Sequence, residues 1–242
     1  MRYLAALLTL CVFASAHADE TKKSNGKFKE LFNGRDLAGW EADEQIWTVE
    51  EGLLTGQTTA DTKLEHNTFA IWTGGEVDDF HLVAEFRLEG DNNSGVQYRS
   101  KRNPDKGKYS IVGYQADIHP AANYVGMLYD EGGRGIAAER GQRVTLGPND
   151  TKELKPQSGE LEPADLTKWN KLEVIARGNR LIHKLNGMET IEVTDNDPKN
   201  AEAKGLLALQ VHAGPPMKVQ YKSVRLKPLK PQKDQAAAPS AK

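Results

Sequence analysis

Residues 169–187 read WNKLEVIARGNRLIHKLNG, and this stretch decides the fold class. Its apolar side chains take every second position, first at Leu172, Val174 and Ala176 and then at Leu181 and Leu185, as in a strand with one buried face. Gly178-Asn179 separates the two segments, and Asn186-Gly187 follows the second, toward Ile191 and Val193. Such dipeptides between alternating segments predict consecutive β-hairpins. His183 falls in the apolar phase, so we expect a core-facing, hydrogen-bonded histidine.

The same period of two recurs elsewhere in the chain. Residues 80–88 alternate from Phe80 to Leu88, and further strands are expected at 46–49, 95–100, 109–118, 205–212 and 218–226. No helical period of useful length is present, so a β-sandwich or jelly roll is favoured over a βαβ architecture. Residues 131–165, rich in Gly, Pro and charge, are expected to form long loops near one end of the sandwich, either functional or a poorly ordered insertion. Four aromatic residues are predicted to be buried: Trp40, Trp47, Phe86 and Trp169.

Composition excludes several classes of function. The 242 residues carry 32 Lys and Arg against 34 Asp and Glu, so no basic field exists to attract nucleic acid. The one long apolar run, residues 4–16, is shorter than the roughly 20 residues of a membrane-spanning helix. We therefore expect neither a nucleic-acid partner nor a membrane span.

The N-terminus resembles an export signal. Arg2, the apolar residues 4–13 and the small-x-small triplet Ala16-His17-Ala18 predict a signal peptide over 1–18, with cleavage before Asp19 and a periplasmic or secreted product. Lipidation of Cys11 is the alternative. Cys11 is the single cysteine, so its removal with the signal excludes zinc-thiolate, Cys-nucleophile and redox-dithiol chemistry. The folded unit is expected over 28–229, followed by a disordered tail over 230–242.

Three expected strands each carry polar residues on one face. Alternation places Gln210 with His212, Gln115 with Asp117 and His119, and Gln97 with Arg99. Any solvent-facing sheet surface shows such a pattern. However, amides, a carboxylate, imidazoles and a guanidinium suit the recognition of a polyol better than a Lys/Glu/Thr surface does.

A glycine-rich segment, YDEGGRG at 129–135, adds further candidates. Tyr129, Glu131 and Arg134 lie among glycines that let a loop approach a ligand closely, although a solvated turn would also explain the glycines. Asp117, Asp130 and Glu131 could alternatively bind Ca²⁺ through carboxylate oxygens. The chain has no G-x-S-x-G, H-E-x-x-H, Walker or G-x-G-x-x-G motif.

Several ordered segments together resemble the 3-keto-disaccharide hydrolase family, also described as 3-keto-glucoside 1,2-lyase/3-keto-2-hydroxyglucal hydratase. They include LFNGRDLAGW (31–40), NNSGVQYRS (92–100), VGYQADI (112–118), GMLYDEGGRG (126–135), WNKLEV (169–174) and LQVHAG (209–214). The resemblance implies a concanavalin A-like jelly roll of two antiparallel sheets. This chain departs from the family at 119–122, which reads HPAA where Gly-Asp is common, and in VQYKSV at 219–224.

The resemblance implies cleavage of a 3-keto-glucoside by removal of the C2 proton, β-elimination at C1 and hydration of the glucal. From residue chemistry and shared faces we hypothesise His212 as base, Arg99 as enolate stabiliser, alone or with a divalent metal, and Asp117 or Glu131 as acid/base. Sugar hydroxyls would be bound by Gln97, Gln115, Tyr129, Arg134 and Gln210. Arg99, Asp117, Gln210 and His212 are expected to converge on one concave surface that residues 129–134 border. A non-catalytic carbohydrate-binding module and a structural cell-surface protein are the alternatives.

Overall fold

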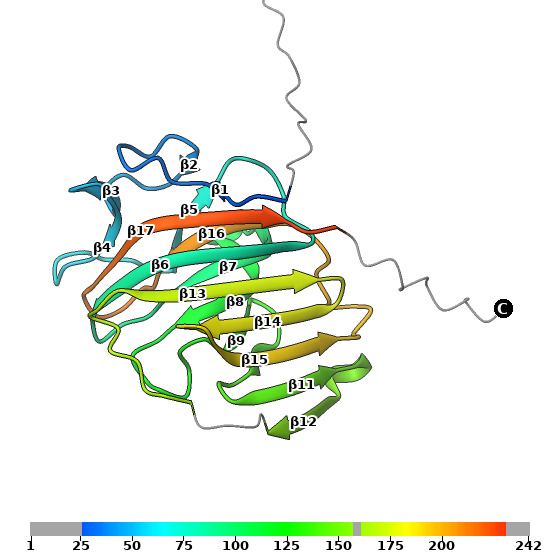
Figure 1. Ribbon diagram of the computed structural model, residues 1–242. Helices are drawn as coiled ribbons and strands as arrows, with labels where there is room; N and C mark the ends of the chain where they lie inside the picture. The colour runs from blue at the N-terminus through cyan, green and yellow to red at the C-terminus, as the bar shows by residue number, and fades with distance from the viewer. Residues whose placement is uncertain (1–25, 157–160, 231–242) are drawn as a thin grey trace, which may run out of the picture.

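A computed structural model describes residues 26–156 and 161–230, which form two packed β-sheets (Figure 1). The expected signal peptide (1–18) and tail positions 231–242 lie outside the described residues. No α-helix occurs in the described ranges, which contain two short 3₁₀ turns, η1 (Pro104–Lys106) and η2 (Pro148–Asp150). No helix in these ranges has the length and apolarity to cross a membrane.

The larger sheet contains β1 (Lys29–Glu30), β3 (Trp47–Glu50), β4 (Leu53–Gln57), β6 (Phe80–Gly90), β11 (Gln142–Leu146), β12 (Lys152–Pro156), β13 (Asn170–Arg177), β14 (Arg180–Leu185), β15 (Met188–Asp195) and β17 (Met217–Pro228). Its order is β12-β11-β15-β14-β13-β6-β17-β4-β3, with β1 beside β17. The smaller sheet contains β2 (Trp40–Glu41), β5 (Thr68–Trp72), β7 (Ser94–Arg102), β8 (Ile111–Ile118), β9 (Leu128–Glu131), β10 (Gly135–Ala138) and β16 (Leu206–Val211). Its order is β10-β9-β8-β7-β16-β5-β2. The predicted jelly-roll sandwich is confirmed.

The two hairpins predicted from residues 169–187 are formed by β13, β14 and β15. β13 and β14 pair antiparallel from Leu172 opposite Leu185 to Arg177 opposite Arg180, and β14 pairs in turn with β15. Asn186 and Gly187 both have positive φ, at 52° and 88°, as a two-residue type I′ turn requires. A turn of this type matches the twist of its strands and so fixes their register.

The core lies between the sheets and is filled by the apolar phase of each strand. Trp47 and Phe86 are fully buried and Trp40 is nearly so, as predicted. The prediction for Trp169 was wrong: its side chain is 38% exposed. Trp169 instead carries Arg87 and Lys222 over its ring, at 5.1 and 4.9 Å from the centroid. Because it precedes β13, it falls outside the alternation that places Leu172 in the core.

Residues 131–165 contain strands where loops were expected. β10, β11 and β12 all lie in this stretch, and Val144 and Leu146 of β11 are buried. β11 pairs in parallel with β15, so the larger sheet is not wholly antiparallel. Strand formation here depends on the open edge that β15 offers, a partner that the local composition does not reveal.

The outer face of the smaller sheet carries the polar phase of its central strands. Leu207, Leu209 and Val211 of β16 belong to the core, so Gln210 faces outward. Tyr114, Ala116 and Ile118 of β8 face the core in the same way, leaving Gln115 and Asp117 outside. Figure 1 shows β7, β8, β9 and β16 as the layer behind β6, β13 and β14.

Candidate functional site

A pocket of about 400 Å³ opens on the outer face of the smaller sheet, and we call it the main pocket. Six residues singled out from the sequence line it, namely Gln115, Asp117, Tyr129, Glu131, Gln210 and His212. Five of them lie on β8, β9 and β16 in one phase of the strand alternation, and His212 directly follows Val211, the last residue of β16. Strand register therefore brings residues together that lie up to about a hundred positions apart.

Three side chains on the pocket floor form a chain of hydrogen bonds. Gln115 donates from Nε2 to Asp117 Oδ1 at 2.7 Å and to Gln210 Oε1 at 3.2 Å. Gly95 of β7 lies opposite both Asp117 and Gln210 in register. A Cβ at Gly95 would meet the Gln115 side chain at 2.4 Å, so glycine provides the space that Gln115 occupies. Both amide orientations are fixed by this chain, because each bond needs a donor and an acceptor.

Polar atoms without partners are concentrated in this pocket. Gln115 Oε1, Asp117 Oδ2, Gln210 Nε2 and Asn93 Oδ1 are buried, and none has a hydrogen-bond partner among the described residues. Leaving a buried donor or acceptor unpaired costs about 1–3 kcal/mol. Three acceptors and one donor around one hollow are suited to a ligand that carries several hydroxyl groups, each of which both donates and accepts.

Two histidines line the main pocket and use their Nδ1 atoms in opposite ways. Nδ1 of His212 lies 2.5 Å from the carbonyl oxygen of Ala213, which can only accept, so Nδ1 carries a proton and Nε2 is the nitrogen left to face a ligand. Nδ1 of His119 accepts the backbone N–H of Ala121 at 2.9 Å, so its proton is on Nε2. Burial and the neighbouring His212 lower the pKa of His119, which favours its neutral form. One imidazole can therefore accept a proton while the other donates a hydrogen bond.

Asparagine side chains hold the backbone that carries His212. Asn92 donates to the carbonyl oxygens of His212 and Pro215, at 3.0 and 2.9 Å. Asn67 accepts the N–H of Ala213 at 3.0 Å and directs its amide nitrogen to Glu131, at 3.4 Å from Oε2. His212 follows the last residue of β16, where the ladder no longer fixes the backbone, so these bonds replace it.

Burial shifts the acidities of the pocket carboxyl groups upward. Removal from water raises the pKa of Asp117 to about 7, with the nearby Glu131 adding to the effect. Burial also raises the pKa of Glu131, although His212 and Asn67 act against it. Tyr129 has a raised pKa for the same reason. Shifts of this kind let carboxyl groups serve as proton donors near neutral pH.

Arg99 does not lie in the main pocket, which corrects the sequence-based expectation. It has a positive φ of 48° at a register shift between Tyr98 and Lys101, so the alternation of β7 breaks there. Its guanidinium is 2% exposed and donates to the carbonyl oxygens of Asp78 and Gly178 at 2.7–2.9 Å, and to Asp79 at 3.3 Å. Backbone carbonyl oxygens satisfy the cation, and it is not available to an enolate.

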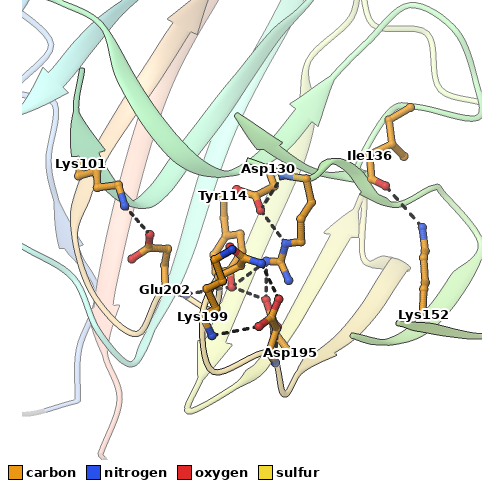
Figure 2. A network of polar contacts seen from close by, with 11 residues as sticks. Lys101, Tyr114, Asp130, Ile136, Lys152, Asp195, Lys199 and Glu202 are labelled. Carbon is orange, nitrogen blue, oxygen red and sulfur yellow. Dashed lines mark hydrogen bonds and ion pairs between the residues drawn. The ribbon is translucent and has the colours of Figure 1, made fainter. Parts of the chain in front are cut away.

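Arg134 is likewise absent from the main pocket. It forms ion pairs with Asp130 at 2.8 Å and Asp195 at 2.6 Å. Figure 2 shows Asp130, Asp195 and Tyr114 close together, and Tyr114 donates to Asp195 at 2.5 Å. Because Asp130 points to the opposite side of β9 from Tyr129 and Glu131, this network stabilises the fold around β9. Arg134 lines a separate hollow of about 540 Å³, the Arg134 cavity.

Gln97 lies beside the main pocket without lining it. It is opposite Gln115 in register and fully buried, and its Oε1 accepts from Ser100 at 2.7 Å. Its Nε2 has no partner among the described residues. Gln97 is therefore not part of the pocket lining, which corrects its assignment as a sugar-binding residue.

The described residues contain no group of three His, Cys, Asp or Glu side chains arranged to hold a metal ion. Asp130, the third carboxylate of the Ca²⁺ alternative, is paired with Arg134. Of the three carboxylates considered as metal ligands from the sequence, Asp117 of β8 and Glu131 of β9 line the main pocket, whereas Asp130 does not.

No role was predicted from the sequence for four polar residues of the pocket: His119, Asn67, Asn93 and Tyr124. His119 was predicted to share a strand face with Gln115 and Asp117, but no function was assigned to it. The other three lie in connections, where no periodicity applies; only the chain-distant contacts of Asn67 with Glu131 and Ala213 reveal its place.

A two-layer jelly roll with a polar pocket on one outer face places this protein in the class of galectin-like and concanavalin A-like β-sandwiches. The chain belongs to the family of 3-keto-alpha-glucoside-1,2-lyase-like domains, which matches residues 27–227. This match confirms the family resemblance found in the sequence. No curated protein matches the chain.

Solved structures share the fold at low identity. A "putative glycosyl hydrolase" from Parabacteroides distasonis is 18% identical, with a TM-score of 0.54 over 84% of this chain and 94% of that chain. A protein of unknown function with a galectin-like fold from Bacillus subtilis is 12% identical, with a TM-score of 0.53 over 85% of this chain and 90% of that chain. At these identities the similarity establishes the architecture alone.

Proposed function

We propose that the protein cleaves 3-keto-glucosides, including 3-keto-disaccharides, by β-elimination and then hydrates the resulting 2-hydroxyglucal. The observation that carries the proposal is the main pocket itself, where four unpartnered polar atoms surround a hollow that also holds a basic imidazole nitrogen and carboxyl groups of raised pKa. Membership in the 3-keto-alpha-glucoside-1,2-lyase-like family supports the same class of substrate.

The first step is loss of the C2 proton. The ketone at C3 makes this proton acidic, and Nε2 of His212 accepts it because the Nδ1 proton is committed to Ala213. The C–H electron pair forms the C2=C3 bond of an enolate, with negative charge on the C3 oxygen. A general base of this kind contributes about 10²–10⁴-fold to the rate.

The enolate oxygen needs hydrogen-bond donors in place of Arg99. Nε2 of Gln210 is a buried donor without a partner, and Nε2–H of neutral His119 faces the same pocket. Burial raises the pKa of Asp117 to about 7, and in the protonated form its Oδ2 donates instead of accepting, which supplies a third donor. Preorganised donors in a site that excludes water stabilise developing charge more strongly than water does.

The second step is departure of the C1 substituent. The enolate electrons re-form the C3 carbonyl, the C2 electrons form the C1=C2 bond, and the C1–O bond breaks. Glu131, whose raised pKa favours its protonated form, gives its proton to the leaving oxygen. Water then adds to C1 of the glucal while C2 regains a proton, and the sum is hydrolysis of the glycosidic bond.

A carbohydrate-binding module without catalysis is the second candidate. The unpartnered amides and carboxylate would bind sugar hydroxyls equally well if no proton were transferred. The two functions separate in one experiment: purified protein is incubated in D₂O with 3-keto-trehalose, 3-keto-lactose and their unoxidised parents, with and without chelator. We expect deuterium at C2 and released sugar from the keto substrates alone. Binding without exchange or release would favour the module.

We also propose that the protein acts after export. The segment ending in Ala16-His17-Ala18 has the composition of a cleaved signal, which predicts Asp19 as the mature N-terminus. Intact mass of the envelope or secreted protein tests this, and a lipid on Cys11 would contradict it.

A further inference from the structure

A second hollow of about 290 Å³ adjoins the main pocket, and we call it the side cavity. Asn67, Glu131 and His212 line both hollows, and these three residues form the ridge between them. Asn67 fixes the other two residues of the ridge, because its side chain accepts the N–H of Ala213, next to His212, and its amide nitrogen contacts the Glu131 carboxylate. The groups assigned to proton transfer therefore stand at a boundary with space on both sides.

The two hollows differ in how they are built. The main pocket holds the buried, unpartnered atoms of Gln115, Asp117 and Gln210, which suits close recognition of one ring. The side cavity is lined by more open polar side chains, namely Glu65, His66, Asn103 and Lys106, with the buried Ser110 below. None of these five has a buried polar atom without a partner in the described ranges. Such a lining suits hydroxyl-bearing ligands with looser selectivity.

On the basis of the proposed function, we infer that the side cavity binds the group that leaves from C1, and that its polar lining selects a second sugar ring over an apolar aglycone. The 3-keto ring occupies the main pocket, and the glycosidic oxygen lies over the ridge, within reach of Glu131. The base and the acid then act on either side of the bond that breaks. Glu65, His66 and Lys106 also line a further hollow of about 210 Å³, so the path continues beyond the side cavity.

The larger Arg134 cavity is the alternative place for the leaving group. It shares Ile136 alone with the main pocket, and neither Glu131 nor His212 lines it. A leaving oxygen on that side would depart away from the proton donor. We therefore assign the leaving group to the side cavity, because this cavity shares Glu131 and His212 with the main pocket, although the Arg134 cavity is larger.

The test compares two substrates on each variant. One is a 3-keto-disaccharide, 3-keto-trehalose, and the other is methyl 3-keto-α-glucoside, which has no second ring. Asn103 and Lys106 belong to the connection between β7 and β8, and both line the side cavity without lining the main pocket. We expect the double variant Asn103→Ala/Lys106→Ala to lower the disaccharide-to-methyl ratio of kcat/KM roughly tenfold, the effect of about one lost hydrogen bond to the second ring. Any effect of Lys106 on the acidity of Glu131 acts on both substrates and largely cancels in the ratio.

Lys152→Ala, in the Arg134 cavity, is the matched control and should leave the ratio unchanged. If Lys152→Ala lowers the ratio and the double variant does not, the leaving group lies in the Arg134 cavity and the inference is overturned. An unchanged ratio in both variants, with the parent active on both substrates, overturns the inference and leaves the proposed function standing. A folded parent inactive on both substrates refutes the proposed function, and the inference with it.

Discussion

At the scale of single residues, two backbone contacts decide the chemistry that each imidazole can perform. His212 gives its Nδ1 proton to a carbonyl oxygen, whereas His119 accepts an amide proton. We expect His212→Ala to slow exchange of the C2 proton by 10²-fold or more, because the base is lost. His119→Ala should slow it by a smaller factor, since Gln210 and Asp117 still face the enolate. NMR of a 3-keto-glucoside in D₂O measures both rates.

The control for this comparison is His81→Ala. His81 lies on β6 in the larger sheet, where it contacts Glu173 at 2.9 Å, remote from the main pocket lining. Its removal should leave exchange at the parent rate. Parent-rate exchange in His212→Ala itself would remove His212 as base and turn attention to Asp117 and Glu131.

Two buried groups give stability opposite dependences on pH. Burial raises the pKa of Asp117 from about 4 to about 7, so the folded state holds a proton that the unfolded chain releases, and stability falls as pH rises from 4 to 7. Burial lowers the pKa of His183 from about 6.5 to about 4, so stability falls as pH drops from 6.5 to 4. Each effect is on the order of 3–4 kcal/mol.

The pH dependences of stability that arise from Asp117 and His183 therefore oppose each other between pH 4 and 6.5 in the parent protein. Asp117→Asn removes one of them, so the variant should become more stable as pH rises from 4 to 6.5 and should exceed the parent in stability at pH 7.5. Urea unfolding at several pH values measures this. A variant with the same pH profile as the parent would show that Asp117 titrates normally.

At the scale of elements, the floor of the main pocket depends on one glycine in a strand. Gly95→Ala would place a Cβ where Gln115 lies, 2.4 Å away, and Gln115 holds both Asp117 and Gln210. We expect turnover to fall at least tenfold, while the melting temperature changes by only a few degrees because Gly95 faces outward. Full activity with an unchanged melting curve would mean that Gln115, Asp117 and Gln210 rearrange without losing their function, and it would contradict the role given to Gly95.

Strands that alternate and end in turn residues could be predicted from sequence, and β6, β13, β14 and β16 were. β5 was not, because Phe69 and Ile71 are covered on the outer face by Ile111 and Ala208, so the strand is apolar on both faces and shows no period of two. The pocket residues of β8 and β16 could be predicted from the alternation of their strands, whereas Tyr129 and Glu131 were singled out in a segment expected to be a loop and lie on β9. Arg99 was misplaced, since the bulge that turns it inward depends on carbonyl groups of Asp78 and Gly178, which are distant in sequence.

Burial of aromatic residues at the ends of strands is also difficult to predict from the sequence pattern. Trp47→Ala should cost about 3–5 kcal/mol, as expected for a fully buried side chain. Trp169→Ala should cost about 1 kcal/mol, because its ring is 38% exposed and contacts the cations of Arg87 and Lys222. Denaturant unfolding of both variants measures the difference, and equal losses would place Trp169 in the core after all.

At the scale of the whole molecule, the larger sheet positions a wall of the pocket on the smaller one. His183 of β14 and Thr190 of β15 both donate to the carbonyl oxygen of Gly126, at 3.2 and 2.8 Å. Tyr98 of β7 donates in turn to Nε2 of His183 at 2.9 Å. The segment fixed in this way carries Tyr124 and Met127, which line the main pocket. The larger sheet thus supports one wall of the pocket through hydrogen bonds that cross the sandwich core.

The four unpartnered atoms of the main pocket have a calorimetric consequence. A sugar that satisfies them exchanges its own hydrogen bonds to water for bonds to atoms that had none, and little apolar surface is covered. Association of an unreactive analogue, methyl α-glucoside, should therefore release heat and show only a small negative heat-capacity change. Titration calorimetry at three temperatures measures both quantities. A large negative heat-capacity change would indicate instead that apolar contact drives association, with Tyr129 and Ile136 as the surfaces that provide it.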